Sequence, residues 1–202
     1  MALGPEPVVE QLYLIRHGET AWSLSGQHTG RTDIPLTARG EAQARWVGER
    51  LRGQLGDRAL ATVLVSPMQR AARTCELAGL GTQARVETAL SEWDYGGYEG
   101  LTSAEIRQRH PDWDVFRDGC PGGESPAQVS ARVDELLMRL RALDGAVALF
   151  SHGHLLRSLA VRWIELPILH GRSFGLDAGA LCLLGYEHHS RSEPAIEIWN
   201  DR

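Results

Sequence analysis

Short apolar runs that stop abruptly at polar or glycine-containing segments recur along this chain. The three clearest runs cover residues 12–15, 60–65 and 146–150. Runs of this length, rich in leucine, valine and alanine, are typical of strands buried on both faces of a sheet. Weaker patterns predict a short strand with a turn and two closing strands, at residues 83–90, 180–186 and 195–199.

Segments with apolar residues at helical spacing lie between these strands. Thr37 is the predicted N-cap of a helix that runs to about Arg52 and ends at Gly53 and Gly56. A further helix is predicted from about His154 to Trp163. Helices of this length between strands indicate crossover connections, which parallel strands require.

Two further helices are predicted from their first residues. Ser66, Pro67 and Gln69 have the pattern of an N-cap, a proline at the first helical position and a capping box. This helix would place Arg70 in its first turn and end at Gly79. The same pattern at Ser125 starts a helix whose apolar face carries Val129, Val133, Leu136, Leu137 and Leu140.

Strands that alternate with helices indicate an α/β protein. We therefore predict a three-layer α/β/α sandwich with a mainly parallel central sheet. A chain of 202 residues has the length of one domain with a substantial core, so we expect residues 1–202 to form a single domain. The glycine- and proline-containing segment at about 96–124 interrupts the pattern, and we expect it to form a lid or side wall of the site.

Composition narrows the classes of partner and chemistry. The chain has 26 acidic residues, 21 arginines, no lysine and a net charge of -5. This balance argues against nucleic acid or a membrane surface as partner. Without lysine, neither a Walker-A phosphate loop nor a Schiff base is available.

Cysteine usage and the absence of targeting patterns favour a cytoplasmic protein. The three cysteines contain no C-x-x-C motif, which fits a reducing compartment and neither a disulfide framework nor a zinc site. The first ten residues lack the basic and apolar regions of a signal peptide, and no apolar run is long enough to span a bilayer.

Charged side chains follow several of the predicted strands directly. Arg16 and His17 follow the first strand, His152 follows the run at 146–150, and Arg70 and Glu92 follow the strands between them. The carboxyl ends of parallel strands meet at the edge of a sheet where ligands bind. Two arginines, two histidines and one carboxylate at this edge predict a site for a phosphoryl group.

Four sequence blocks carry a resemblance to a known family. Segments 16–20 (Arg-His-Gly-Glu-Thr), 66–71 (Ser-Pro-Met-Gln-Arg-Ala), 92–96 (Glu-Trp-Asp-Tyr-Gly) and 151–154 (Ser-His-Gly-His) occur in this order. They resemble the histidine phosphatase (phosphoglycerate mutase-like) superfamily, in its phosphatase branch. The resemblance implies an enzyme, a phosphoric monoester hydrolase that works without a cofactor.

The resemblance also implies roles for the five central residues. His17 would be the nucleophile, since a neutral imidazole can attack phosphorus and form a phosphohistidine. Arg16 and Arg70 would hold phosphoryl oxygens, with His152 as a further donor in the transition state. Glu92 would protonate the leaving oxygen and then activate water. Nearby guanidinium groups should help to keep His17 uncharged.

Residues matching substrate-contacting positions of the family lie around these five. They are Ser23, Thr29, Gly30, Tyr95, Gly153 and His154. Ser23 and His154 stand where mutase-like members commonly carry asparagine, so contacts with the substrate should differ from those of mutases. Although the His152 and His154 spacing allows two metal ligands, no Asp-His follows and no Asp-x-His occurs elsewhere, and we expect no metal site.

The expected substrate is a small phosphomonoester, either a sugar phosphate or the varied substrates of a broad-specificity acid phosphatase. The alternative is a 2,3-bisphosphoglycerate-dependent phosphoglycerate mutase, although mutases carry a longer segment with basic residues after the Tyr-Gly-Gly block. A further alternative is a catalytically silent module that binds phosphorylated ligands. The resemblance also suggests a homodimer.

Overall fold

The computed structural model describes residues 9–202, which form a six-stranded sheet in the order β3-β2-β4-β1-β5-β6. Its first four strands pair in parallel, whereas β5 pairs antiparallel with β1 and β6. The prediction of a mainly parallel sheet is confirmed. The strands are β1 (Val9–Arg16), β2 (Leu60–Val65), β3 (Ala84–Val86), β4 (Gly145–Ser151), β5 (Leu181–Tyr186) and β6 (Pro194–Asp201).

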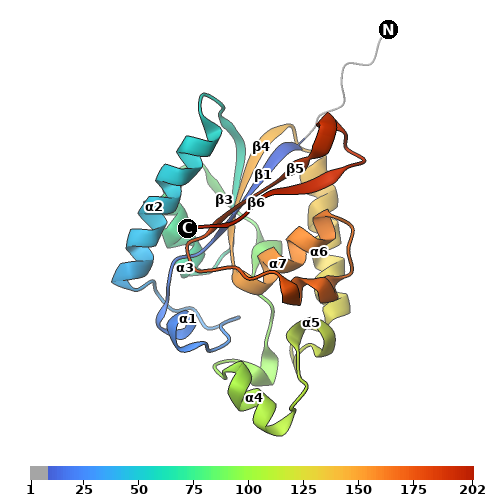
Figure 1. Ribbon diagram of the computed structural model, residues 1–202. Helices are drawn as coiled ribbons and strands as arrows, with labels where there is room; N and C mark the ends of the chain where they lie inside the picture. Colours follow the sequence, from blue (N-terminus) through green and yellow to red (C-terminus); the bar gives the residue numbers. More distant parts are fainter. Residues whose placement is uncertain (1–8) are drawn as a thin grey trace.

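Helices cover both faces of this sheet (Figure 1), which confirms the three-layer architecture. The helices α2 (Ala38–Leu55) and α3 (Gln69–Leu77) pack together on one face, and α6 (Pro126–Arg141) and α7 (Gly153–Trp163) pack on the other. Within residues 9–202, no helix combines the length and the apolar character needed to cross a membrane. The expectation that no signal peptide is present concerns a segment mostly outside the described residues.

The alternating side chains of β1 join the two cores. Leu12 and Leu14 belong to the core beneath α6 and α7, whereas Tyr13 and Ile15 belong to the core beneath α2 and α3. All four side chains are fully buried. A strand buried on both faces reads as a continuous apolar run, which explains why this element was predictable from the sequence.

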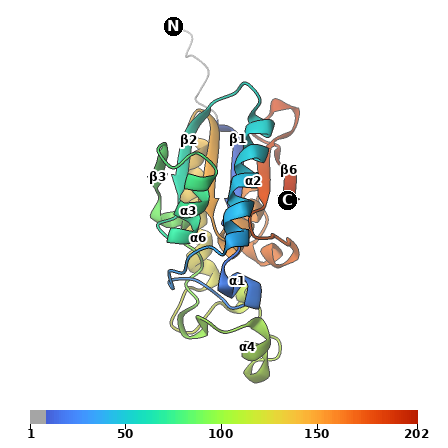
Figure 2. The same cartoon turned by 90° about the vertical axis from the view of Figure 1, so that its left-hand side faces the viewer.

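The remaining helices lie beyond the carboxyl ends of the strands (Figures 1 and 2). They are α1 (Ala21–Ser25), α4 (Ser103–Arg109) and α5 (Val115–Asp118). The segment at 96–124, expected to be irregular, contains α4 and α5 and contributes Ser103 to the wall of the central pocket. The roles of this segment as a side wall or a lid stay predictions.

Three of the predicted helix starts agree with the structure and one does not. Thr37 caps α2, and Ser125 caps α6 with the predicted capping box. The predicted cap at Ser66 is wrong, because α3 begins at Gln69 and its preceding residue makes no side-chain cap bond. The Ser66 backbone instead continues the sheet, while the Gln69 side chain donates to the carbonyl of Asp33. The helix predicted from about 154 begins at 153.

Candidate active site

His17 follows β1 directly and is almost completely buried. Its Nδ1 lies 2.8 Å from the carbonyl oxygen of Gly18. Because a carbonyl only accepts, Nδ1 carries the proton, and the lone pair of the neutral ring is on Nε2. Burial is the main cause that lowers the pKa of His17 well below its usual value, and Arg16 and Arg70 lower it further. The sequence had pointed to the guanidinium groups alone.

His152, at the end of β4, packs against the nucleophile candidate. Its ring centroid lies 5.1 Å from that of His17, with the planes at 62°. Arg70 Nε donates to His152 Nδ1 at 3.2 Å, and His152 Nε2 donates to Ser66 Oγ at 2.7 Å. Burial, and after it Arg70, lowers the pKa of His152 well below its usual value. Ser66 thus fixes the ring of His152, which explains why it does not cap α3.

Arg70 is fully buried, and its terminal N–H groups hold the loop after α1. Nη1 donates to the carbonyl of Thr32, and Nη2 donates to the carbonyls of Thr29 and Gly30, each at 3.0 Å. The expected contact of Arg70 with a phosphoryl group stays a prediction. In the structure, Arg70 also fixes the loop that carries Thr29 and Gly30, two of the expected substrate contacts.

Arg16 extends from the end of β1 into the pocket. Its Nη1 donates to the carbonyl of Leu176, and its Nε is buried with no hydrogen-bond partner among residues 9–202. Buried donors of this kind are rare in folded proteins. A guanidinium with an unused donor beside His17 is suited to bind an anionic oxygen.

Glu92 lies across the pocket and is held in one orientation. Its Oε1 accepts from the backbone N–H groups of Trp93 at 2.9 Å and Leu155 at 2.8 Å, and its Oε2 accepts from His154 at 3.0 Å. Two of these donors belong to the first turn of α7, where N–H groups lack partners within the helix. The carboxylate therefore lines the same pocket as His17.

A cluster of rings forms the far wall of the pocket. The Tyr95 hydroxyl lies 2.5 Å from His154 Nδ1. Burial raises the pKa of Tyr95 well above its usual value and lowers that of His154 well below its own. Both groups are therefore neutral, the hydroxyl donates to Nδ1, and the His154 proton is on Nε2. His28 lies against Tyr95 with ring centroids 4.7 Å apart.

These groups surround a pocket of about 250 Å³. Of the expected substrate contacts, Ser23, Thr29, Tyr95, Gly153 and His154 line it, together with Arg16, His17 and Glu92. Arg70 and His152 are not among the lining residues: His152 packs against His17, and Arg70 bonds to His152. Gly30 is not among them either, since its N–H bonds to the Glu99 carboxylate, and its role stays a prediction.

Several lining residues were not predicted from the sequence. They include Gln27, His28, Ser103, Arg157 and Leu176. Arg157 lies on α7 three residues after His154, close to one helical turn, and this spacing was the available signal. Its Nε donates to the carbonyl of Gly171, and its guanidinium lies 4.7 Å from the centre of the Phe116 ring. Burial lowers the pKa of Arg157.

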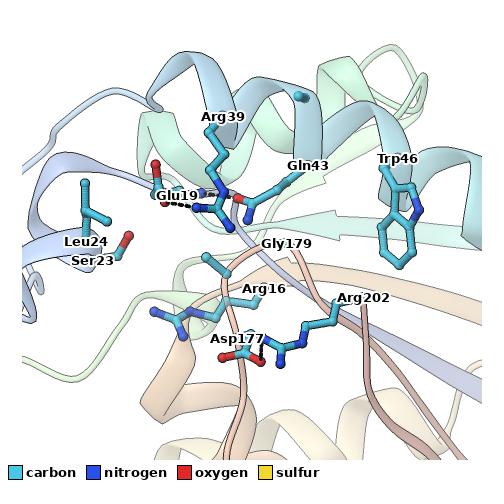
Figure 3. A pocket seen from close by; sticks show the side chains of 12 residues that line it. Arg16, Glu19, Ser23, Leu24, Arg39, Gln43, Trp46, Asp177, Gly179 and Arg202 are labelled. Atoms are coloured by element: carbon cyan, nitrogen blue, oxygen red, sulfur yellow. Dashed lines mark hydrogen bonds and ion pairs between the residues drawn. The ribbon is translucent and has the colours of Figure 1, made fainter.

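Arg16 also lines a larger adjoining cavity of about 730 Å³ (Figure 3). In Figure 3, Arg39 and Trp46 extend from α2 toward this space, and the ion pair between Asp177 and Arg202 lies on its opposite side. Ser23 lines both cavities. The two cavities therefore adjoin at Arg16 and Ser23, and Arg16 directly precedes the nucleophile candidate His17.

Within residues 9–202, no group of three His, Cys, Asp or Glu side chains is placed to hold a metal ion. His152 and His154 turn to different partners, the first to Ser66 and Arg70 and the second to Tyr95. The site consists of neutral histidines, arginines and one carboxylate at the carboxyl ends of parallel strands. Fold and site together define an α/β enzyme suited to bind and transfer a phosphoryl group.

Comparison with known proteins gives the family. The model of the histidine phosphatase superfamily (branch 1) matches residues 12–202. An acid phosphatase of Mycobacterium tuberculosis is 44% identical over 184 residues, covering 90% of this chain and 89% of the relative. A sedoheptulose 1,7-bisphosphatase of Saccharomyces cerevisiae is 31% identical over 245 residues, covering 92% and 90%.

A solved structure supports the same assignment. The product of an open reading frame of Mycobacterium tuberculosis superposes with a TM-score of 0.86 at 40% identity, covering 95% of this chain and 97% of that chain. The present chain belongs to the histidine phosphatase superfamily. The resemblance carried by the four sequence blocks is confirmed, and with it the expectation of an enzyme of the phosphatase class.

Proposed function

We propose that this protein is a metal-independent phosphatase that hydrolyses small phosphomonoesters through a phosphohistidine on His17. The observation that carries the proposal is the state of His17 beside Arg16. Its ring is buried and neutral, with Nδ1 bonded to the Gly18 carbonyl and the lone pair on Nε2. A neutral imidazole in this tautomer needs no base before it attacks phosphorus.

In the first step, Nε2 of His17 forms a bond to phosphorus while the bond to the leaving oxygen breaks. Arg16 stabilises the negative charge on the phosphoryl oxygens. Arg70 and His152 hold the loop after α1 and the ring of His17 in place around these oxygens. Glu92, protonated at this stage, gives its proton to the leaving oxygen, so that the product departs as an alcohol. This produces phospho-His17 and a Glu92 carboxylate.

In the second step, water attacks phospho-His17. The Glu92 carboxylate takes a proton from this water as its oxygen bonds to phosphorus, and the bond to Nε2 breaks. Inorganic phosphate leaves, His17 returns to its neutral form, and Glu92 is protonated again. The two steps together consume one ester and one water and release one alcohol and one phosphate.

The lining of the pocket supports a sugar phosphate as substrate. Gln27, His28, Ser103 and His154 offer polar atoms around the pocket, and Arg157 adds a cation to the same wall. Convergent donors and acceptors of this kind suit a ligand rich in hydroxyl groups. A broad-specificity acid phosphatase acting on varied small esters is the wider form of the same proposal.

The predicted location and assembly belong to this proposal as well. A cytoplasmic enzyme is expected from cysteine usage, and a homodimer is expected from the resemblance. Light scattering on the purified full chain measures the mass of the particle in solution. A mass near twice 22.3 kDa supports the dimer, and a mass near 22.3 kDa excludes it.

The proposal is tested by phosphate release in the presence of EDTA. The substrates are p-nitrophenyl phosphate, 3-phosphoglycerate and several sugar mono- and bisphosphates, and the proteins are the wild type and His17→Ala. We expect release that EDTA does not affect and that His17→Ala loses by at least about 1,000-fold, as other enzymes do without their nucleophile.

Three results would overturn the proposal. Loss of activity with EDTA, regained on adding a divalent metal, would contradict the metal-free mechanism. Interconversion of phosphoglycerates with little phosphate release would identify a mutase. Ligand binding without turnover of any substrate in the panel would identify a silent binding module.

A further inference from the structure

The segment that carries Glu92 is fixed on both sides by a single ion pair. We propose that the Arg132–Glu124 pair is a positioning device for Glu92, which sets its carboxylate at the distance needed for proton transfer to the leaving oxygen. This inference rests on the proposed function, because that function makes Glu92 the proton donor. Neither Arg132 nor Glu124 lines the pocket, so both would act through Glu92.

Arg132, on α6, holds the chain before Glu92. Its Nη1 donates to the carbonyls of Ala89 and Ser91, each at 2.8 Å. Its Nε and Nη2 donate to the two carboxylate oxygens of Glu124 at 3.0 and 2.8 Å. One planar guanidinium therefore ties the residues that precede Glu92 to the Glu124 carboxylate, in a geometry that lysine cannot reproduce.

Glu124 holds the chain after Glu92. Its Oε2 accepts from the backbone N–H of Asp94 at 2.9 Å, and its own N–H donates to the Asp94 carbonyl at 2.9 Å. Its carbonyl accepts from the indole N–H of Trp93 at 2.9 Å. Residues 89, 91, 93 and 94 are thus all anchored, and Glu92 is the residue between the anchors.

The pair has the features of a firm contact rather than a loose surface bridge. The side chains of Arg132 and Glu124 are 21% and 22% exposed, and the contact is bidentate, which strengthens it over an ordinary exposed ion pair. Proton transfer requires close approach of donor and acceptor, and a misplacement of about 1 Å can lower a rate about 100-fold. Loosening the anchors should therefore affect the proton-transfer step most.

The chain offers a matched control on the same helix. Asp134 of α6 accepts from Arg162 of α7 through both carboxylate oxygens at 2.8 and 3.0 Å. The Arg162 side chain is 28% exposed and the Asp134 side chain 44% exposed, so the control pair is bidentate like the first pair but more open to solvent. Arg162 also donates to the carbonyl of Leu166, and none of these contacts reaches the segment at 89–94.

The experiment compares two leaving groups. The kcat and KM are measured for p-nitrophenyl phosphate, whose leaving group departs without a proton, and for glycerol 2-phosphate, whose alkoxide requires one. The proteins are the wild type, Glu92→Gln, Arg132→Lys and Arg162→Lys, with Glu124→Gln as a second test should Arg132→Lys fail to fold. Thermal unfolding establishes that each variant is folded at the assay temperature.

We expect Arg132→Lys to lower kcat/KM for glycerol 2-phosphate at least tenfold more than kcat/KM for p-nitrophenyl phosphate. The ratio kcat/KM reports the step that forms phospho-His17, whereas kcat also contains the hydrolysis of the phosphoenzyme that both substrates share. Glu92→Gln should show the same preference, and Arg162→Lys should leave the ratio of the two kcat/KM values at the wild-type level. In the Glu92→Gln background, Arg132→Lys should not change this ratio further, because the two changes affect one step.

Two results overturn the inference, and they are distinguishable. If Glu92→Gln shows the leaving-group preference while Arg132→Lys and Glu124→Gln lower kcat/KM for both substrates equally or not at all, the ion pair is only structural and the role of Glu92 stands. If Glu92→Gln itself leaves the ratio unchanged, Glu92 is not the proton donor, and the positioning role is contradicted together with that part of the proposed function.

Discussion

Four buried histidines at the site share one property, a pKa that is lowered chiefly by burial. This holds for His17, His28, His152 and His154. Guanidinium groups lower the pKa of all four further, although nearby Glu99 opposes the shift at His28. Burial disfavours a charged ring wherever water is excluded. These four histidine rings therefore stay uncharged at acidic pH values at which exposed histidines are protonated.

The pH dependence of activity follows from the state of His17. Its pKa lies well below 6.5, so the fraction of neutral nucleophile stays near one as the pH falls through this value. We expect kcat/KM for p-nitrophenyl phosphate to show no loss with a midpoint near pH 6.5. The measurement is a profile from pH 8 to 4.5, with tryptophan fluorescence as a check that the protein remains folded.

The opposite result is equally clear. A kcat/KM that halves near pH 6.5 in folded protein, and whose midpoint moves when Arg16 is changed to Ala, would show that His17 titrates as an exposed histidine does. The claim that burial keeps the nucleophile neutral would then be wrong. Changing exposed His110 to Gln serves as the control that should leave the profile as it is.

Among the elements, the junction between β1 and α2 places the nucleophile most directly. A Cβ on Gly18 would collide with the Gly40 carbonyl, and a Cβ on Gly40 would collide with the backbone of Glu19. The Gly18 N–H donates to Thr74 Oγ1 at 3.1 Å. Glycine at 18 and 40 thus lets the end of β1 pack directly against the first turn of α2.

We expect Gly40→Ala to destabilise the protein by about 1–3 kcal/mol and to lower kcat, because the overpacked junction must move the backbone of Glu19, two residues after His17. Gly53→Ala, in the same helix, should stabilise the protein by up to about 1 kcal/mol. At Gly53, no atom of residues 9–202 lies within 4 Å of the added Cβ apart from its chain neighbours and the backbone of its own helix. Urea unfolding and steady-state kinetics measure both effects.

Equal stability of the Gly40→Ala variant and the wild type would contradict this account of the junction. So would a Gly40→Ala variant that is destabilised but keeps the wild-type kcat, since the packing would then not position His17. Gly53→Ala supplies the comparison, because it changes the same residue type in the same helix without a collision.

Length and capping chemistry decided which elements could be predicted. The helix α6 has 16 residues, a capping box and a proline at its start, and all of these are visible in the sequence. The helix α1 has five residues, too few for an apolar period to appear, so only its Thr20 capping box signals it. The cap predicted at Ser66 was wrong because its hydroxyl accepts a hydrogen bond from His152, 86 residues away. No local sequence pattern records such a contact.

At the scale of the whole molecule, the sheet explains why the site could be predicted as a set. Arg16 is the last residue of β1, and His17 and His152 directly follow β1 and β4. These are neighbouring parallel strands, so the rule for parallel strand ends places the three residues together. Gln27 and His28 reach the pocket from the loop after α1, and Ser103 reaches it from the first turn of α4. Their positions depend on tertiary packing, which leaves no periodic pattern of apolar and polar residues in the sequence.

Stability should depend on pH through the buried histidines. Burial lowers the pKa of His28 to about 4, from a usual value of 6.5. The unfolded chain therefore binds more protons than the folded protein between these values, and stability is lost as the pH falls from about 6.5 toward 4. For His28 alone, the free energy of unfolding should drop by about 2 kcal/mol between pH 7 and pH 5.

Urea unfolding at the two pH values measures this loss. His17, His152 and His154 contribute with the same sign, so the wild type should lose at least the amount assigned to His28. His28→Gln should reduce the loss, and His110→Gln should not. Equal stability at pH 7 and pH 5 would contradict the account, as would a full loss retained by His28→Gln.

The central claim is that a buried, neutral His17 carries the phosphoryl group, and trapping the phosphoenzyme tests it most directly. Wild type and His17→Ala are mixed with radiolabelled p-nitrophenyl phosphate in the presence of EDTA and quenched with alkali within milliseconds to seconds. We predict label on the wild type that is stable in alkali and lost in acid, as phosphohistidine is, and no label on His17→Ala. Label that survives acid, or equal labelling and turnover of His17→Ala, would contradict the account.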